Sequence, residues 1–104
     1  MLFRSGRSRA DATLAIARAE YEGALTAYNL SRDLARQNRD VFLPKAREAR
    51  DRLGLAYRRG GASLLDFLDA ERTLRQTSLN YINALAAHEN ALTALEAATG
   101  KTFE

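Results

Sequence analysis

The chain of 104 residues contains no cysteine, no tryptophan, one proline and one histidine. Without cysteine it has neither disulfides nor thiolate chemistry. A single histidine, His88, cannot form a histidine metal cluster. No apolar run approaches the roughly 20 residues that a helix needs to cross a bilayer. We therefore expect no bound metal and no cofactor, and the length allows at most one domain.

Helix-forming residues dominate what is present. Hydrophobic residues make up 46% of the chain, chiefly alanine and leucine, and there are only six glycines. Alanine and leucine are strong helix formers, whereas glycine and proline interrupt helices. The composition therefore predicts an all-α fold and not a disordered chain.

The positive charge is concentrated in parts of the chain. Residues 1–9 carry three arginines and no acid, which equals the whole net charge of +3. We expect residues 1–9 to be a disordered basic leader, residues 10–100 to form the folded part and residues 101–104 to be a tail. Because no groove-reading motif and no exposed stacking aromatics are evident, we expect no nucleic-acid partner.

The second half of the chain predicts one long helix over residues 63–98. Its larger side chains recur at alternating spacings of three and four, which is the heptad pattern of a coiled coil. Thr99 and Gly100 should end the helix, with the glycine supplying a left-handed closing residue. The predicted contact positions are Leu64, Phe67, Glu71, Leu74, Ser78, Tyr81, Leu85, His88, Leu92 and Leu95.

The first half predicts a helix over residues 10–58 with a kink near Pro44, which lacks a backbone donor. Apolar residues lie on two faces of this helix, so we expect neighbours on two sides. One face holds Leu14, Ala17, Tyr21, Ala24 and Tyr28, and the other holds Leu30, Leu34 and Val41.

Gly60 and Gly61 predict a tight reversal between the two helices, which makes the fold an extended antiparallel hairpin. If residues 63–98 pair back to about residue 23, residues 10–22 have no partner in the chain. The chain thus looks like a fragment. We expect it to self-associate when isolated, as an antiparallel pair forming a four-helix bundle.

The residues after the turn have simple structural interpretations. Ser63 and Asp66 match a capping box, in which each side chain binds the other residue's backbone N–H. Asp69 can pair with Arg72 or Thr73 on a solvated face. Tyr57 can be an aromatic residue at the edge of the core, while Tyr81 and His88 fit packing positions. Paired carboxylates would need a pocket to catalyse a reaction, and a hairpin offers none, so we do not expect an enzyme.

Residues 43–100 closely resemble the end of the TolC-like outer-membrane factors, the exit ducts of Gram-negative tripartite efflux pumps. The resemblance rests on "AYRRGGASLLDFLDAERTL", on "LNYINAL" and on the closing "ALTALEAATG". "LPKARE" and the final "ATG" are similar to the heavy-metal efflux branch. Residues 10–42 match more loosely, as the preceding long helix.

The resemblance implies a homotrimeric duct in the outer membrane with a periplasmic α-barrel, of which this chain would be one hairpin. It would export small molecules or metal ions passively, together with a periplasmic adaptor protein and an inner-membrane transporter. The resemblance also implies that Asp66, Asp69 and Tyr57 form the entrance gate. The adaptor would contact the tip at Arg59, Gly60 and Gly61.

Ala62 stands where the family often has an arginine, and "RGG" replaces a more apolar tip, so this part of the latch departs from the pattern. The alternative interpretation is a stand-alone coiled-coil dimerisation module with a structural role. A signal peptide, strand segments and a second hairpin encoded upstream would favour the duct. The exported substrate cannot be read from these residues, because selection in such pumps belongs to the inner-membrane transporter.

Overall fold

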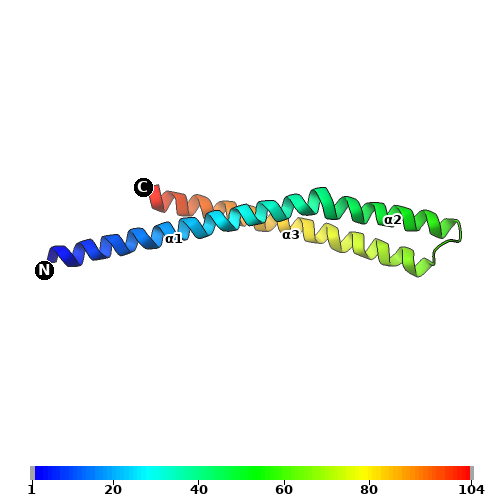
Figure 1. The fold of residues 1–104 in the computed structure, drawn as a ribbon, viewed down its shortest axis with the longest axis horizontal. Helices are drawn as coiled ribbons and strands as arrows, with labels where there is room; N and C mark the ends of the chain where they lie inside the picture. The colour runs from blue at the N-terminus through cyan, green and yellow to red at the C-terminus, as the bar shows by residue number, and fades with distance from the viewer. Residues whose placement is uncertain (1, 104) are drawn as a thin grey trace.

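The protein is an extended hairpin of two long helical arms. The computed structural model describes residues 2–103, with side chains described for residues 8–100. The first arm consists of α1 (Leu2–Gln37), a π-helical turn η1 (Asn38–Phe42) and α2 (Leu43–Arg58), and the second arm is α3 (Leu64–Phe103). The arms run antiparallel (Figure 1). No strand occurs among residues 2–103, so the predicted all-α hairpin is confirmed.

The hairpin is long and thin. It measures 85 × 18 × 14 Å, with a radius of gyration of 23.4 Å. A compact domain of this length would have a radius of gyration of about 13 Å. No large side chain among the described residues is fully buried. The molecule therefore has a line of contact between two helices and no thick hydrophobic core.

Both arms extend further than predicted. α1 begins at Leu2, so the backbone of residues 2–9, expected to be a disordered leader, is helical. α3 continues to Phe103, and Gly100 does not adopt the left-handed conformation expected of a closing residue. A glycine inside a helix costs only about 1 kcal/mol relative to alanine. Ala98 is buried, so packing of this end of α3 offsets that cost.

The contact line of α3 differs from the predicted one at Leu64, Leu85 and Leu92, whereas Glu71 and Ser78 are half-buried, as expected. The larger residues Phe67, Leu74, Tyr81, His88 and Leu95 are half-buried, as expected. Between these larger residues, the contact line contains the residue that follows each of them by three places. Most of these smaller residues are alanine. Leu64, Leu85 and Leu92 were predicted contacts but are 49%, 44% and 38% exposed. The small contact residues of α3 are Ala70, Thr77, Ala84, Ala91 and Ala98.

The same pattern occurs in α1. Its half-buried and buried positions again follow spacings of four and three. The first arm has two apolar faces, as expected. One lies mainly on the contact line, and the other, which holds Leu30, Leu34 and Val41, is exposed. The contact positions of the first arm up to the first residue of the π turn are Ala17, Tyr21, Ala24, Tyr28, Ser31, Ala35 and Asn38.

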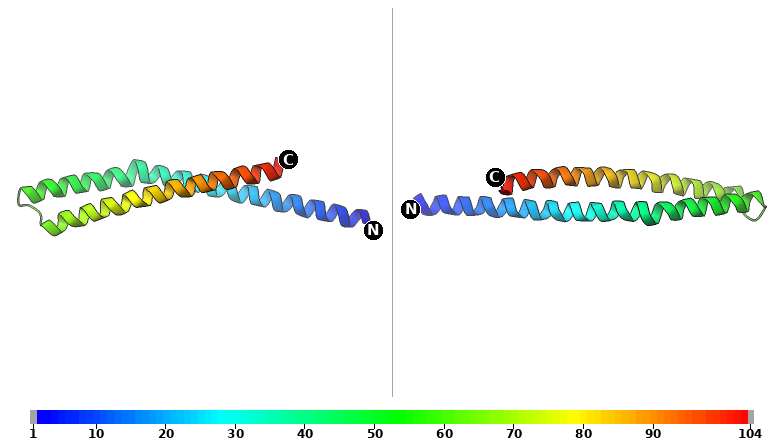
Figure 2. Two further views of the ribbon diagram at one scale, coloured as in Figure 1. Left: turned by 180° about the vertical axis from the view of Figure 1, so that it is seen from behind. Right: turned by 90° about the horizontal axis from the view of Figure 1, so that it is seen from above.

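The overhang of the first arm is shorter than predicted. We expected residues 10–22 to have no partner, but Ala17 and Tyr21 are half-buried because α3 reaches Phe103. Leu14 stays 44% exposed. Figure 2 shows the N-terminal end of α1 running past the C-terminal end of α3.

The irregularity near Pro44 is a π-helical turn, and the helical path continues through it. The Leu43 N–H donates to the Asn38 carbonyl, five residues back. Pro44 then lies in the first turn of α2, directly after the π turn. Its ring and its missing N–H are thus placed at an irregularity and not inside a regular α-helix. The turn inserts one residue, so the contact line passes from Asn38 to Leu43 in place of residue 42. Figure 1 shows the arm changing direction here, in agreement with the predicted kink.

The π turn predicts the effect of deleting one residue from it. Removing Asp40 should convert the arm to continuous α-helix and keep all later contact positions in register. Asp40 is exposed, and its ion pair with Arg39, at 2.7 Å, lowers the pKa of the carboxyl group. Pro44 would then lie in a helix interior, which costs about 3 kcal/mol.

We therefore expect the Asp40 deletion to lower the midpoint of urea unfolding, measured by circular dichroism. Adding Pro44→Ala to the deletion should restore most of the loss. An unchanged midpoint in the single deletion would show that the π turn does not serve to accommodate Pro44.

Candidate functional site at the hairpin tip

Backbone hydrogen bonds at the end of α2 build the turn. Gly60 has a φ of +79° and is the residue in the left-handed conformation, as expected for one of the two glycines. The Gly61 N–H donates to the Ala56 carbonyl at 2.8 Å, and the Gly60 N–H donates to the Tyr57 carbonyl at 3.1 Å. These two bonds form a Schellman motif, which satisfies the last carbonyls of the helix.

A capping box begins α3 on the other side of the turn. The Asp66 N–H donates to Ser63 Oγ at 3.1 Å, and the Ser63 N–H donates to Asp66 Oδ2 at 3.3 Å. Such a cap stabilises a helix by roughly 1 kcal/mol. The predicted cap is therefore confirmed, and it fixes the Asp66 carboxylate at the positive end of α3.

Asp69 lies one turn further along and is solvated. Its carboxylate is 3.6 Å from Arg72 Nη1, and the side chains of Asp69 and Arg72 are 56% and 77% exposed. An ion pair this exposed contributes little to stability. Asp66 and Asp69 line the same groove between α2 and α3, together with Ala46, Ala49, Leu53, Ala70 and Thr73. Both carboxylates therefore share one flank of the tip.

The Tyr57 ring packs on α3. It stacks on the Phe67 ring with centroids 6.0 Å apart and an angle of 19° between the planes. Gly54 lies beneath Phe67, and a Cβ there would be 3.1 Å from the Phe67 ring. Tyr57 stays 39% exposed, so part of its side chain remains open to solvent. This contact was not predicted from the sequence, although Gly54 inside a helical segment was the available signal.

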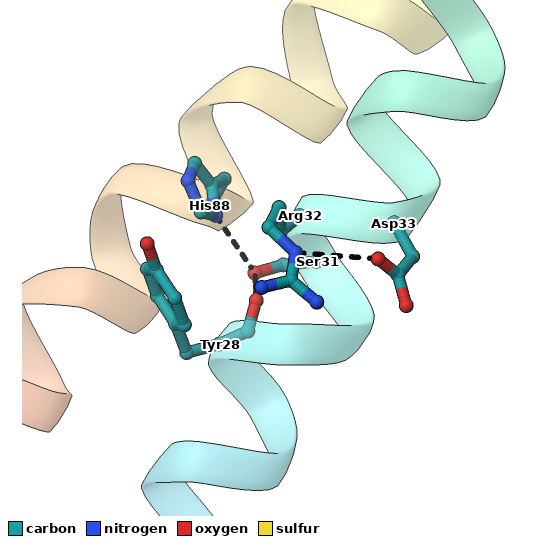
Figure 3. A network of polar contacts seen from close by, with 5 residues as sticks. All are labelled: Tyr28, Ser31, Arg32, Asp33 and His88. Atoms are coloured by element: carbon teal, nitrogen blue, oxygen red, sulfur yellow. Dashed lines mark hydrogen bonds and ion pairs between the residues drawn. The ribbon is translucent and has the colours of Figure 1, made fainter.

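A polar layer interrupts the contact line far from the tip (Figure 3). The Ser31 hydroxyl donates to the Tyr28 carbonyl at 2.9 Å and forms a hydrogen bond with His88 Nδ1 at 3.3 Å. The Tyr28 and His88 rings pack with centroids 4.8 Å apart. His88 and Tyr81 are both half-buried on the contact line, as predicted for packing residues.

The tip residues Arg59, Gly60 and Gly61 are exposed and available to a partner. Within the part of the chain that the structure describes, no three metal-binding side chains cluster together. None of the described helices is long and apolar enough to cross a membrane. Comparison of the chain with protein-family models, curated proteins and solved structures gave no match.

The geometry of the turn predicts different roles for its two glycines. Replacing Gly60 with alanine forces a side chain into the left-handed region, which should destabilise the hairpin by about 1 kcal/mol. Gly61 has no positive φ, and a Cβ there would lie 3.7 Å from the Ala56 carbonyl oxygen, an ordinary contact distance. Gly61→Ala should therefore be neutral or slightly stabilising.

Thermal unfolding of both variants checks this difference, with Gly61→Ala as the matched control. Equal midpoints for the two variants would contradict the assignment of the closing residue to Gly60.

Proposed function

We propose that the chain is part of the periplasmic wall of the exit duct of a tripartite efflux pump. Residues 57–69 form the periplasmic tip and entrance gate, and transport through the duct is passive. The resemblance to the TolC-like family supports this proposal, and so does the extended hairpin, since a duct wall requires helices much longer than those of a compact domain.

The observation that carries the proposal is the second apolar surface on each arm. Sixteen large hydrophobic side chains are exposed among the described residues, which include Leu30 and Leu34 on α1 and Ile82 and Leu85 on α3. Water contact of this much apolar area is unfavourable by about 25 cal/mol per Å². Helices in a barrel wall have a neighbour on each side and would cover these surfaces.

The proposal assigns the partners and location of the full-length protein. It is a homotrimer in the outer membrane with a periplasmic extension, and this segment is periplasmic. The adaptor protein contacts Arg59, Gly60 and Gly61, and an inner-membrane transporter completes the pump. The exposed side chain of Arg59 and the exposed glycines support such a contact.

The gate consists of Asp66, Asp69 and Tyr57. Because both carboxylates lie on one flank of the tip, copies arranged around an axis would place them in a ring. A ring of acids attracts cations and opposes anions at a pore entrance. The exposed part of the Tyr57 side chain would contact the neighbouring hairpin.

A stand-alone coiled-coil dimerisation module is the second candidate. The heptad contact line and the exposed leucines would also suit a chain that dimerises for structural reasons. The gene separates the two, because a duct requires upstream segments that encode a signal peptide, strand segments and a second hairpin. An intact gene that encodes only residues 1–104 would favour the module.

The test of the gate uses the full-length protein in a planar bilayer. Compared with wild type, the Asp66→Asn, Asp69→Asn double variant should show lower cation selectivity and weaker block by multivalent cations. Asp69→Asn alone should produce part of the effect, because Asp69 takes no part in the cap. Glu89→Gln is the matched control, since Glu89 is an exposed acid far from the tip.

Trimer assembly is checked for each variant before the recording. Unchanged selectivity and unchanged block in the double variant would leave capping as the whole role of Asp66, and the gate would be wrong.

A further inference from the structure

A groove on one flank of the hairpin, here called the arginine groove, is lined by basic and aromatic side chains. It has a volume of about 230 Å³, which lies below the range of drug-sized ligand sites and suits a small ligand. No acid among the described residues lines it, whereas Asp66 and Asp69 line the groove at the tip. The lining includes Arg32, Arg36 and Arg39 from α1 and Tyr81 and His88 from α3.

The three arginines form a row along α1. Their spacings of four and three places put them on one face of the helix, and the row extends over roughly 10 Å. Like charges at these spacings repel each other and destabilise the helix. A bound anion would offset this repulsion, so the row favours a negatively charged ligand.

Acids of the chain hold these arginines only weakly. Arg32 pairs with Asp33, whose side chain is 65% exposed, and such a pair contributes little to stability. Arg39 pairs in the same way with Asp40, whose side chain is 57% exposed. No ion pair joins Arg36 to an acid within residues 8–100. Arg36 can therefore bind an added anion directly, and the other two guanidinium groups can turn toward it at small cost.

The aromatic side chains supply further hydrogen-bonding groups to the groove. The Tyr28 ring packs on the His88 ring with centroids 4.8 Å apart, and both rings line the groove. The hydrogen bond from His88 Nδ1 to Ser31 fixes the imidazole in place. Figure 3 shows Tyr28, His88 and Arg32 in this region. Tyrosine hydroxyl groups donate hydrogen bonds to anionic oxygens, so the groove offers donors beyond its guanidinium groups.

The arginine groove and the tip aspartates lie on opposite flanks of the hairpin. Leu85 lines the arginine groove and follows the contact residue Ala84 by one place. Asp66 precedes the contact residue Phe67 by one place. In a heptad pattern these two kinds of position lie on either side of the contact line. If the tip aspartates face the pore of the proposed duct, the arginine groove faces outward and stays open.

We propose that the arginine groove binds a linear polyphosphate group, which the three guanidinium groups hold along its length. Guanidinium groups form paired, charge-assisted hydrogen bonds with phosphate oxygens. A row of roughly 10 Å is longer than one phosphate, so a chain of phosphates matches it better. Free polyphosphate and nucleoside triphosphates share this chemistry. The site goes beyond the proposed export function and does not depend on it.

Isothermal titration calorimetry of the 104-residue chain with inorganic triphosphate tests the site. In a buffer of low ionic strength without divalent cations, binding should saturate at one triphosphate per chain. Arg36→Gln should weaken it by about tenfold or more, because charge-assisted hydrogen bonds are lost. Arg36→Lys should also weaken it several-fold, because lysine keeps the charge but lacks the planar fork of donors.

Arg52→Gln is the matched control, because it removes the same charge from a position on α2 outside the groove. The side chains of Arg52 and its partner Glu48 are 71% and 73% exposed, so the loss of their ion pair costs little stability. This variant should bind triphosphate like wild type. Circular dichroism verifies that all variants keep their helicity, as expected for exposed positions replaced by helix-forming residues.

Adenosine triphosphate and citrate distinguish the possible ligands. Equal affinity for adenosine triphosphate and triphosphate would identify the phosphate chain as the recognised group, and tighter binding of adenosine triphosphate would identify a nucleotide. Both results support the proposal. It is overturned if neither compound binds saturably at millimolar concentration, or if citrate, a carboxylate of similar charge, binds as tightly as triphosphate. Equal weakening by Arg36→Gln and Arg52→Gln would show diffuse attraction to a basic chain and would also overturn it.

Discussion

The structure depends on the alternation of large and small side chains along the contact line between the arms. Buried alanines such as Ala35, Ala84 and Ala98 let the helix backbones approach, while Tyr28, Tyr81 and His88 fill the spaces between them. Alanine buries little apolar area, so this contact line contributes less than a leucine seam would. Many of the leucines lie on the outside of the hairpin, where their apolar surface is exposed.

The sequence predicted the elements well and their contact surface only in part. Two heptad patterns share Phe67, Leu74, Tyr81, His88 and Leu95. They differ in which residue lies on the contact line between each two of these shared positions. Hydrophobicity favoured Leu85 and Leu92, whereas the structure uses Ala84 and Ala91. Periodicity alone cannot decide this, because the choice depends on the opposing helix, whose contact residues are themselves small. Leu85 and Leu92, which the hydrophobic pattern placed on the contact line, are exposed.

Around the tip, local features were predictable and contacts between the arms were not. The glycine in the left-handed conformation and the capping box follow from signals within a few residues, and both are present. The stacking of Tyr57 on Phe67 and the Ser31–His88 hydrogen bond join residues from different helices. The pairing of Ser31 with His88 depends on the register between the arms, which the one-residue insertion of the π turn changes beyond residue 38. Pro44 marked the place of this irregularity without revealing its form.

Capping of α3 does not prevent the two tip aspartates, Asp66 and Asp69, from also forming a gate. The cap holds the Asp66 carboxylate at the end of α3 through a hydrogen bond from the Ser63 backbone, yet leaves the side chain exposed. A carboxylate has more acceptor sites than this one bond uses. The Asp69–Arg72 pair is long and solvated, so a cation could displace Arg72 at small cost. In the proposed duct, the residues that end the turn and begin the helix would therefore also present ordered negative charge at the entrance.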